Sequence, residues 1–407
     1  MKTIHLKYPN RKLNGTLALS GSKSISNRLL MLQKLAAQEI DIINLSDSQD
    51  TQILNQILTK DAESYDAYHA GTSFRFATAY FSIQQGVQFI TGSEQLRKRP
   101  IAPLVTALNN LGADISYIEK EGFAPIKIGS FTKQDKRRIS IAGDVSSQHI
   151  SALCMLAPVL PKGLIIDIKG QLVSQPYLQM TLAMMENFGI HYNWEDSIIE
   201  IAPQAYHLPK QYIVESDWSS ASYYYAMISL VEKGRLKIKH LSEKSTQADQ
   251  VIVELARHFN VKSYFEDNEV TLVKEGNKSI NDFSYDFISC PDLAQTVAVM
   301  CAGLGVHANL SGLQTLRIKE TDRISALAKE LAKTGIDVAE TPNGLELKGK
   351  TEKYSEEFES YQDHRMVMCL ACLSVLGEVQ IKNPEVVTKS YPNFWKDLQA
   401  LGFIINV

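Results

Sequence analysis

The feature that most constrains the fold is a repeat with a period of about 73 residues. Six stretches share one form, a small or polar cluster followed by an apolar run of helical length. They begin near residues 22, 71, 145, 217, 291 and 363, so successive starts are 49, 74, 72, 74 and 72 residues apart. Such regular spacing indicates that one structural unit is used six times and that the first copy is short.

A second pattern follows the first within most units: an amphipathic helix, a Gly or Asn stop, and then a strand. In "LVTALNNLGADISY", Leu104, Leu108 and Leu111 recur at helical spacing. The stop position, which favours a left-handed backbone, is occupied by Gly112, Gly189, Gly335 and Gly402. Short strands such as "EVTLV" and "GLELKG" complete the units. Each unit is therefore predicted to contain two helices and several strands.

Six units divide naturally into two sets of three, with a boundary near residues 205–215. A solenoid is the alternative, but solenoid repeats are usually about 20–45 residues long. The chain of 407 residues is long enough for two domains with ample cores. Two globular halves enclosing a cleft is therefore the architecture that the pattern favours.

Composition excludes several classes of partner. The hydrophobic fraction of 44% and charged fraction of 21% are those of a soluble globular protein. A net charge of −3 gives no general attraction to nucleic acid or to an acidic membrane, so anion binding must come from local clusters. The N-terminus lacks the apolar core of a signal peptide, and no uncharged apolar stretch has the length of a membrane span. We therefore expect a cytoplasmic protein.

The five cysteines are expected to be core residues. "CLAC" at 369–372 has the spacing of a metal or redox motif, but no second pair and no paired histidines accompany it. All except Cys290 lie in apolar runs, where buried thiols are common.

The polar clusters lie at predicted helix starts, where unpaired N–H groups and a partial positive charge favour anions. The first three starts carry Lys23, Ser24, Arg28, Gly71, Thr72, Arg75, Ser146, Ser147 and Gln148. The last three carry Asp217, Asp292 and Asp363, and His364 and Arg365 follow the last of these. Aspartate and serine are also good N-caps, which alone explains Asp217. Cations at a helix start oppose the dipole, so their clustering predicts a bound anion.

Further cations lie close to these starts. "LRKRPI" contains Arg99, and Lys389 stands in "VVTKSYPNF". In "LRIKETDR", Lys319 and Arg323 are four residues apart and are predicted to share one helical face. "SGSKSISNR" looks like a phosphate loop, yet Ser22 occupies the place where a nucleotide loop needs glycine before its lysine.

In this order, "GSKSISNR", "HAGTSFRF", "RKRPI", "DVSSQ", "LVSQPY", "KETDR" and "QDHRM" resemble the motifs of 5-enolpyruvylshikimate-3-phosphate synthases, from about residue 20 to the C-terminus. The resemblance implies an α/β (α+β) fold: a two-domain inside-out α/β barrel of six βαβαββ-type repeats, three per domain, here with the first repeat shortened. It implies one domain at 19–215 and another at 1–18 and 216–407, with the active site in the cleft between them.

The resemblance also implies a reaction. The enolpyruvyl group of phosphoenolpyruvate would move to the 5-hydroxyl of shikimate 3-phosphate by addition and elimination through a tetrahedral intermediate, releasing phosphate. Each substrate carries a carboxylate and a phosphate, which suits an arginine-rich site. No metal and no cofactor is implied. The two substrates would be the partners of a monomer that binds neither nucleic acid nor membrane.

Matching positions receive roles by resemblance. The catalytic set is Lys23, Asp292, Lys319 and Glu320, in which Asp292 is the base at the 5-hydroxyl. The shikimate 3-phosphate set is Lys23, Ser24, Arg28, Ser146, Ser147, Gln148, Ser174, Tyr177, Asp292, Thr315 and Lys319. The phosphoenolpyruvate set is Lys23, Gly71, Arg99, Gln148, Arg323, Arg365 and Lys389. Supporting or open roles fall to Thr72, Arg75 and His364. Which of Lys319 and Glu320 moves the methylene proton stays open.

The chain departs from the family pattern in places. The first unit lacks roughly 24 residues between "QDTQIL" and "HAGT", so we expect a trimmed sheet with an intact helix start. His69 and Thr315 each replace a common Asn. Trp218 stands where a small residue is usual, and we assign it to packing.

Three other functions are weighed. A transferase of the same fold acting on a UDP-sugar usually has Asn where Ser24 stands and a reactive Cys near "RP", which "LRKRPI" lacks. An ATP-dependent small-molecule kinase is disfavoured by the glycine spacing. A non-catalytic anion-binding protein would bind both substrates without releasing phosphate.

Overall fold

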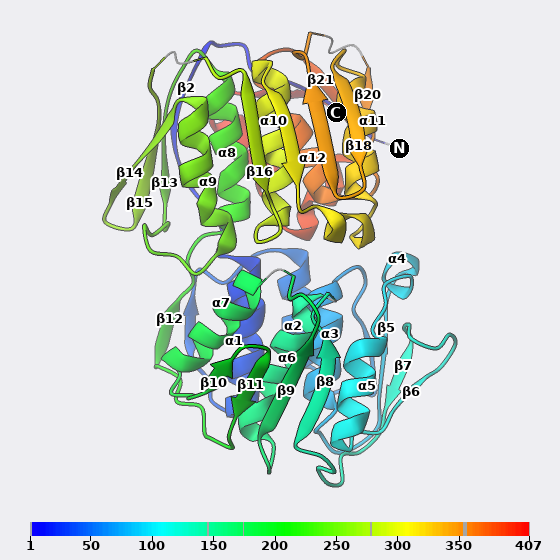
Figure 1. Ribbon diagram of the computed structural model, residues 1–407. Helices are drawn as coiled ribbons and strands as arrows, with labels where there is room; N and C mark the ends of the chain where they lie inside the picture. The colour runs from blue at the N-terminus through cyan, green and yellow to red at the C-terminus, as the bar shows by residue number, and fades with distance from the viewer. Residues whose placement is uncertain (1, 145, 174, 277–278, 353–355, 407) are drawn as a thin grey trace. The chain divides into compact units, whose positions relative to one another are not determined.

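The computed structural model describes residues 2–406 apart from 145, 174, 277–278 and 353–355. It divides into two compact units, which we describe one at a time. The inserted unit is Gly21–Val214, and the terminal unit combines Met1–Ser20 with Glu215–Val407. Each has its own apolar core. Figure 1 shows helices and strands mixed throughout both units.

Strands of the inserted unit form three sheets in the part of the chain that the structure describes. One has the order β4-β5-β7-β6, with β4 at Ser64–Asp66, β5 at Gln88–Thr91, β6 at Ile115–Tyr117 and β7 at Ile126–Ile128. Another has the order β10-β11-β9-β8, with β8 at Arg138–Ala142, β9 at Leu164–Lys169, β10 at Asn193–Glu195 and β11 at Ile198–Ile201. The last pairs β3 (Asp41–Ile43) with β12 (Gln211–Ile213).

The inserted unit's helices alternate with these strands, as the repeat predicts. They are α1 (Lys23–Ala36), α2 (Gln49–Thr59), α3 (Gly71–Phe81), α4 (Glu94–Arg97), α5 (Ala102–Leu111), α6 (Ser147–Leu156), the 3-10 turn η1 (Ala157–Val159) and α7 (Gln175–Asn187).

The terminal unit has three four-stranded sheets among its described residues. The first has the order β14-β15-β13-β2, with β2 at Lys12–Ala18, β13 at Lys233–Lys239, β14 at Val261–Glu266 and β15 at Glu269–Lys274. The second has the order β16-β17-β19-β18, with β16 at Asp282–Asp286, β17 at His307–Ser311, β18 at Asp337–Thr341 and β19 at Gly344–Lys348. The third has the order β20-β21-β1-β22, with β1 at Thr3–Lys7, β20 at Glu357–Phe358, β21 at Val379–Lys382 and β22 at Ile404–Asn406.

Helices of the terminal unit again follow the strands. The α-helices are α8 (Trp218–Leu230), α9 (Ile252–Leu255), α10 (Ala294–Leu304), α11 (Arg323–Ala332), α12 (His364–Ala371) and α13 (Phe394–Ala400). The 3-10 turns are η2 (Ala248–Val251), η3 (Ala256–Phe259), η4 (Pro291–Leu293), η5 (Gln314–Ile318), η6 (Cys372–Val375) and η7 (Pro384–Lys389).

All five four-stranded sheets of the described chain share one strand order and one pattern of parallel and antiparallel pairs. In the second repeat, β4 runs parallel to β5, and the hairpin of β6 and β7 adds antiparallel to β5. A parallel pair needs a crossover connection, which the intervening helix provides. The order of elements is therefore strand, helix, strand, helix and hairpin, which confirms the βαβαββ repeat.

The first repeat is the exception. β12 pairs parallel to β3, and α1 and α2 have their expected places, but the described residues include no hairpin in this repeat. Ile43 and Ile213, which pair in register, are exposed on this short sheet. The shortened first repeat and its trimmed sheet are confirmed, and the start of α1 is intact.

The two N-terminal strands join sheets formed by the second half of the chain, so the terminal unit contains both chain ends. β2 runs parallel to β13 and so supplies the first strand of the fourth repeat. β1 lies antiparallel between β21 and β22 and completes the sixth. The N-terminal residues thus finish two sheets of a unit whose remaining residues begin at Glu215.

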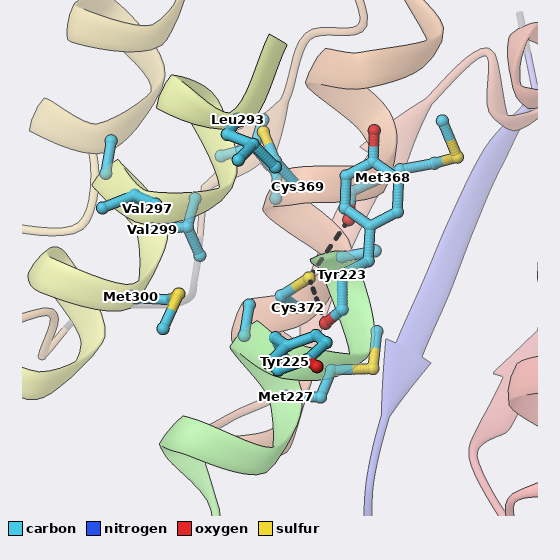
Figure 2. Close-up of a cluster of buried hydrophobic side chains, with 14 of the residues drawn as sticks. Tyr223, Tyr225, Met227, Leu293, Val297, Val299, Met300, Met368, Cys369 and Cys372 are labelled. Atoms are coloured by element: carbon cyan, nitrogen blue, oxygen red, sulfur yellow. Dashed lines mark hydrogen bonds between the residues drawn. The ribbon is translucent and has the colours of Figure 1, made fainter. Parts of the chain in front are cut away.

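Three helices pack together inside each unit. α10 contacts both α8 and α12 in the terminal unit, and α1, α3 and α6 contact one another in the inserted unit. α8 is buried along almost its whole length, as expected for a helix that is apolar on all sides. Figure 2 shows the side chains of α8, α10 and α12 interlocking, with Tyr223, Val299 and Met368 among them. These three helices therefore form the centre of each unit's core.

The cysteine prediction is confirmed. All five cysteines are free thiols and are buried. The Cys372 thiol donates to the carbonyl oxygens of Tyr223 and Met368, and burial raises its pKa well above the usual value (Figure 2). "CLAC" is part of the core.

The predicted helix ends are confirmed, but one of the predicted helices is broken. Gly112, Gly189, Gly335 and Gly402 have positive φ, and Asn260 takes this conformation in the fourth repeat. The helix predicted there over "VIVELARHFNV" is broken, because only the four residues of α9 are α-helical and 3-10 turns flank them. No helix in the described ranges combines the length and apolar character needed to cross a membrane.

The tight helical core generates a stability prediction. Ile228 on α8 is fully buried, whereas Ile318 is 65% exposed. Ile228→Ala leaves a cavity and should lower the free energy of unfolding by about 2–5 kcal/mol. Ile318→Ala, the matched control, should change it by about 0.5 kcal/mol or less. Urea unfolding followed by circular dichroism checks both, and equal effects would contradict the packing described.

Candidate active site

The start of α1 holds a lysine beside a buried carboxylate. Ser22 caps the helix by accepting from the backbone N–H of Ile25. Lys23 Nζ lies 3.4 Å from the Asp50 carboxylate, and the Asp50 carbonyl accepts from the Ser73 hydroxyl at 2.7 Å. Asp50 thereby links α2, α3 and the lysine, which keeps a partly exposed side chain. Lys23 is thus oriented, yet can still reach a ligand.

Arg28 lies deeper in the inserted unit. Its guanidinium donates to the Thr181 hydroxyl at 2.7 Å, the Ser24 carbonyl at 2.9 Å and the Tyr177 carbonyl at 3.0 Å. Burial lowers the pKa of Arg28 to about 10. Arg28 therefore ties the start of α1 to α7, and it brings Ser24 and Tyr177 into one neighbourhood.

The start of α3 has the features of an anion site. Within the described residues, no side chain caps its N-terminus, where Ala70 is the N-cap. A Cβ on Gly71 would lie 2.5 Å from Nη1 of Arg99 and 2.9 Å from Nη1 of Arg75. Unpaired helix N–H groups beside two guanidinium groups favour a phosphate or a carboxylate. A side chain at position 71 would therefore displace the Arg99 guanidinium from its place beside the start of α3.

Arg75 connects three segments of this site. Its guanidinium donates to the Gly71 carbonyl at 3.0 Å, the Pro100 carbonyl at 3.0 Å and the Gln148 side chain at 3.2 Å. Its Nε donates to Nε2 of His149 at 2.7 Å. Burial, assisted by the charges of Arg75 and Arg99, holds the pKa of His149 well below its usual range, so the ring stays neutral and can accept. Arg75 therefore holds the starts of α3 and α6 and the segment at Pro100 together.

The start of α6 supplies hydroxyls and an amide. Ser146 caps the helix, Ser147 is buried in its first turn, and the Gln148 amide donates to the Thr72 hydroxyl at 2.8 Å. Gln148 thus joins the starts of α3 and α6. Ser174 lies outside the described residues.

The terminal unit is organised around a buried arginine. Arg323 is 2% exposed, and its Nε lies 2.7 Å from the Asp363 carboxylate. Its remaining donors reach Asp292 at 3.0 Å and Glu320 at 2.8 Å. Burial alone would lower the pKa of Arg323, but Asp363, Glu320 and Asp292 raise it above the usual value. Three carboxylates are thereby collected around one cation.

Asp292 and Arg365 form the partly exposed side of this cluster. Asp292 lies in the turn η4 just before α10, and its second oxygen is 2.9 Å from Nη2 of Arg365. Arg365 follows Asp363, whose carboxylate caps α12 by accepting from the Arg365 N–H. One carboxylate is thus clamped by Arg323 and Arg365, an arrangement that favours its ionised form.

Lys319 and Glu320 correct one sequence prediction. Asp322 caps α11, which therefore begins at Arg323, so Lys319 lies before the helix and shares no helical face with Arg323. Glu320 nevertheless reaches both Arg323 and Lys389, whose Nζ is hydrogen-bonded to Oε1 of Glu320. The charged side chains of "KETDR" therefore come together because the chain bends before α11, and not because they share a face of a helix.

The remaining residues singled out in the sequence differ in their surroundings. His364 is 2% exposed, and its Nδ1 lies 3.8 Å from the Asp363 carboxylate. His69 is 2.6 Å from the Ser93 hydroxyl. Thr315 is half-buried in η5, and in the part of the chain that the structure describes its hydroxyl has no hydrogen-bond partner. Trp218 is fully buried, as assigned.

Sequence reasoning gave no site role to four residues that organise the charges. Each is at most 4% exposed: Asp50, His149, Asp249 and Asp363. Three of them contact a predicted site residue directly, since Asp50 pairs with Lys23, His149 with Arg75 and Asp363 with Arg323. Asp249 contacts Ser219, which is hydrogen-bonded to Arg365. Asp363 has a signal in the sequence, since it directly precedes His364 and Arg365. The other three follow polar stretches that resemble ordinary helix caps. Among the described residues, no group of three His, Cys, Asp or Glu side chains could hold a metal ion.

Comparisons with known proteins agree with this geometry. The family model "EPSP synthase (3-phosphoshikimate 1-carboxyvinyltransferase)" matches residues 7–61 and 54–398. A 3-phosphoshikimate 1-carboxyvinyltransferase of Bacteroides fragilis is 40% identical over 403 residues, which cover 97% of each chain. One of Shewanella pealeana is 32% identical over 423 residues, covering 97% of this chain and 98% of the relative.

A solved structure of EPSP synthase from Acinetobacter baumannii has the same fold. Its TM-score is 0.80 at 19% sequence identity, and the match covers 100% of each chain. Together with the family model and the two relatives, this establishes that the chain belongs to the EPSP synthase (3-phosphoshikimate 1-carboxyvinyltransferase) family.

Proposed function

We propose that the two groups of charged side chains perform the reaction of this family on one pair of substrates. The chain is a 3-phosphoshikimate 1-carboxyvinyltransferase, a transferase of the shikimate pathway. It moves the enolpyruvyl group of phosphoenolpyruvate to the 5-hydroxyl of shikimate 3-phosphate and releases phosphate. The observation that carries the assignment of roles is the Asp292 carboxylate held between Arg323 and Arg365.

Phosphoenolpyruvate is the proposed ligand of the cations. In the inserted unit these are Lys23 and Arg99, next to Gly71 at the uncapped start of α3. In the terminal unit they are Arg323, Arg365 and Lys389. A phosphate and a carboxylate need several donors of positive charge, and arginine binds both in a bidentate manner. Gln148 completes this set.

Shikimate 3-phosphate is the proposed ligand of the hydroxyl-rich starts. The set is Lys23, Ser24, Arg28, Ser146, Ser147, Gln148, Ser174, Tyr177, Asp292, Thr315 and Lys319. In its support, Arg28 links Ser24 to Tyr177, and the Thr315 hydroxyl has no partner among the described residues. Hydroxyls and helix N–H groups suit a phosphate ester.

Proton transfer is assigned to the carboxylates. Two arginines keep Asp292 ionised, and its carboxylate takes the proton of the 5-hydroxyl. The hydroxyl oxygen of shikimate 3-phosphate then attacks C2 of phosphoenolpyruvate. Glu320 or Lys319 delivers a proton to the methylene carbon. In the elimination step the methyl group returns a proton to the same side chain, and phosphate leaves as its bond to C2 breaks. Charge that develops on the phosphate is stabilised by fixed cations, and no step uses a metal or a cofactor.

The proposal needs both charge groups to contact the substrates at once. The active site would therefore lie in the cleft between a domain at 19–215 and one at 1–18 and 216–407. We further propose that the protein works as a monomer in the cytoplasm. We also propose that it has no nucleic-acid partner, because a net charge of −3 gives no general attraction to nucleic acid. Light scattering during size-exclusion chromatography tests the monomer.

Phosphate release measured with both substrates, and then with each one withheld, tests the proposed function. Release should require both and continue without ATP or Mg²⁺. UDP-N-acetylglucosamine in place of shikimate 3-phosphate should give none, since the comparisons do not favour the UDP-sugar enzyme. Binding of both substrates without phosphate release would instead identify an anion-binding protein.

Asp292→Asn removes the proposed base and keeps the shape of the side chain. We expect kcat to fall by roughly 10²–10⁴ because general base catalysis contributes this much. Binding of shikimate 3-phosphate, measured by calorimetry, should stay within a few-fold. Asp337→Asn, at an exposed aspartate of the same unit, is the control. Retained turnover in Asp292→Asn would remove the base role.

Arg99→Gln tests the cation at the start of α3. Loss of a hydrogen bond to a charged group costs about 1.5–3 kcal/mol, so KM for phosphoenolpyruvate should rise roughly 10- to 100-fold. Lys98→Gln changes the neighbouring cation, whose exposed side chain pairs with Glu94, and should leave KM unchanged. Steady-state kinetics compares the two, and similar KM values would exclude Arg99 from the site.

A further inference from the structure

Asp249 is a buried carboxyl group to which the mechanism above gives no role. It lies in the turn η2 and is 3% exposed. Its Oδ2 accepts the hydroxyl of Ser219, in the first turn of α8. Its Oδ1 is buried and has no hydrogen-bond partner in the described part of the chain. A buried carboxyl with one unpaired oxygen is costly, so its retention needs an explanation.

The turn that carries Asp249 is fixed against the start of α8. Two residues earlier, the Gln247 amide donates to the Ser216 carbonyl at 2.9 Å and accepts from the Trp218 N–H at 3.1 Å. The hydrogen bonds of Gln247 therefore fix the backbone close to Asp249 against the backbone close to Ser219. The distance between their side chains is set by this contact of η2 with α8.

Ser219 connects Asp249 to the reaction centre. The Ser219 oxygen accepts from Nη2 of Arg365 at 3.3 Å, and the same nitrogen lies 2.9 Å from Oδ2 of Asp292. One hydroxyl thus donates to Asp249 and accepts from the guanidinium that binds Asp292. The two carboxyl groups lie on opposite sides of one Ser–Arg link.

We propose that Asp249 is a positioning residue that acts through the Ser219 hydroxyl on the Arg365 guanidinium, and so on the Asp292 carboxylate that this guanidinium binds. The inference rests on the proposed function, in which Arg365 contacts phosphoenolpyruvate and Asp292 is the base. It adds a group that touches neither substrate but orients one that does.

Burial and the neighbouring charges bring the titration of Asp249 close to neutral pH. Burial, and then the nearby Asp292 carboxylate, raise the pKa of Asp249 to about 7. Asp217 at the start of α8 acts in the same direction, Arg365 on α12 opposes it, and the Cys290 thiol, whose own pKa burial raises, faces it from the segment before η4. A neutral Asp249 leaves the Arg365 charge to Asp292 and the substrate. Its ionisation adds a second carboxylate that competes for the same guanidinium.

Kinetics of Asp249→Asn, Asp249→Ala and Ser219→Ala test the proposal. Asparagine keeps an acceptor for Ser219 without a titrating group, so its kcat/KM for phosphoenolpyruvate at pH 6.5 should stay within about threefold of the wild type, less than one typical hydrogen bond contributes. Its pH profile should lack the inflection near 7 that we expect for the wild type. Both alanine variants should raise KM for phosphoenolpyruvate about tenfold, with a smaller change in kcat. The double alanine variant should lose no more than either single one.

Two outcomes would overturn the proposal: unchanged KM in both alanine variants, or losses that add in the double variant. Arg365→Gln separates this failure from that of the proposed function. If Arg365→Gln leaves KM for phosphoenolpyruvate unchanged, the proposed function is wrong at this residue. If Arg365→Gln raises KM and the Asp249 and Ser219 variants do not, only the positioning role is wrong.

Thermal unfolding supplies a readout that does not depend on activity. The folded pKa of Asp249 lies above its unfolded value of about 3.8, so ionisation destabilises the folded protein as pH rises through about 7. The Tm of Asp249→Asn relative to the wild type should therefore increase between pH 5 and pH 8, by about 2 °C or more. Asp337→Asn, at an exposed position, is the control. A Tm difference that is the same at both pH values would contradict the buried titration.

Discussion

The ion cluster around Arg323 is the interaction on which the terminal unit's chemistry depends. A buried guanidinium is stable only when it is paired, and here Asp363, Asp292 and Glu320 surround it. The cluster positions the proposed base through Asp292, the cation Lys389 through Glu320, and the start of α12 through Asp363. One arginine thus holds three segments that lie far apart in the sequence.

The inserted unit meets a similar constraint with fewer carboxylates. Arg75 donates to two backbone carbonyls, to Gln148 and to a neutral His149. This keeps Arg75 itself next to Gly71, beside which Arg99 also lies. The two units therefore stabilise buried cations differently: carboxylates surround Arg323, whereas backbone carbonyls, an amide and a neutral imidazole accept from Arg75.

Much of the fold could be predicted from the sequence because its signals are local. The apolar period of each helix, the glycine stops and the repeat spacing depend on neighbours within a few residues. A prediction from the sequence is wrong where a local signal has two interpretations. KETDR fits an i, i+4 helical pair, but the Asp322 cap starts α11 at Arg323 and leaves Lys319 outside it. The broken helix around α9 has no comparable signal in the sequence.

By itself, the sequence determined the six repeats, the short first repeat and the ordered motifs that identify the family. The resemblance already implied that residues 1–18 join the C-terminal half, but the tertiary structure decided which strands β1 and β2 pair with and in which register, as in the pairing of Lys12 with Lys233, more than 200 residues away. It also decided that Asp249, Ser219 and Arg365 meet. Contacts of this kind depend on packing between distant segments, and the sequence of each segment alone contains no record of its partner.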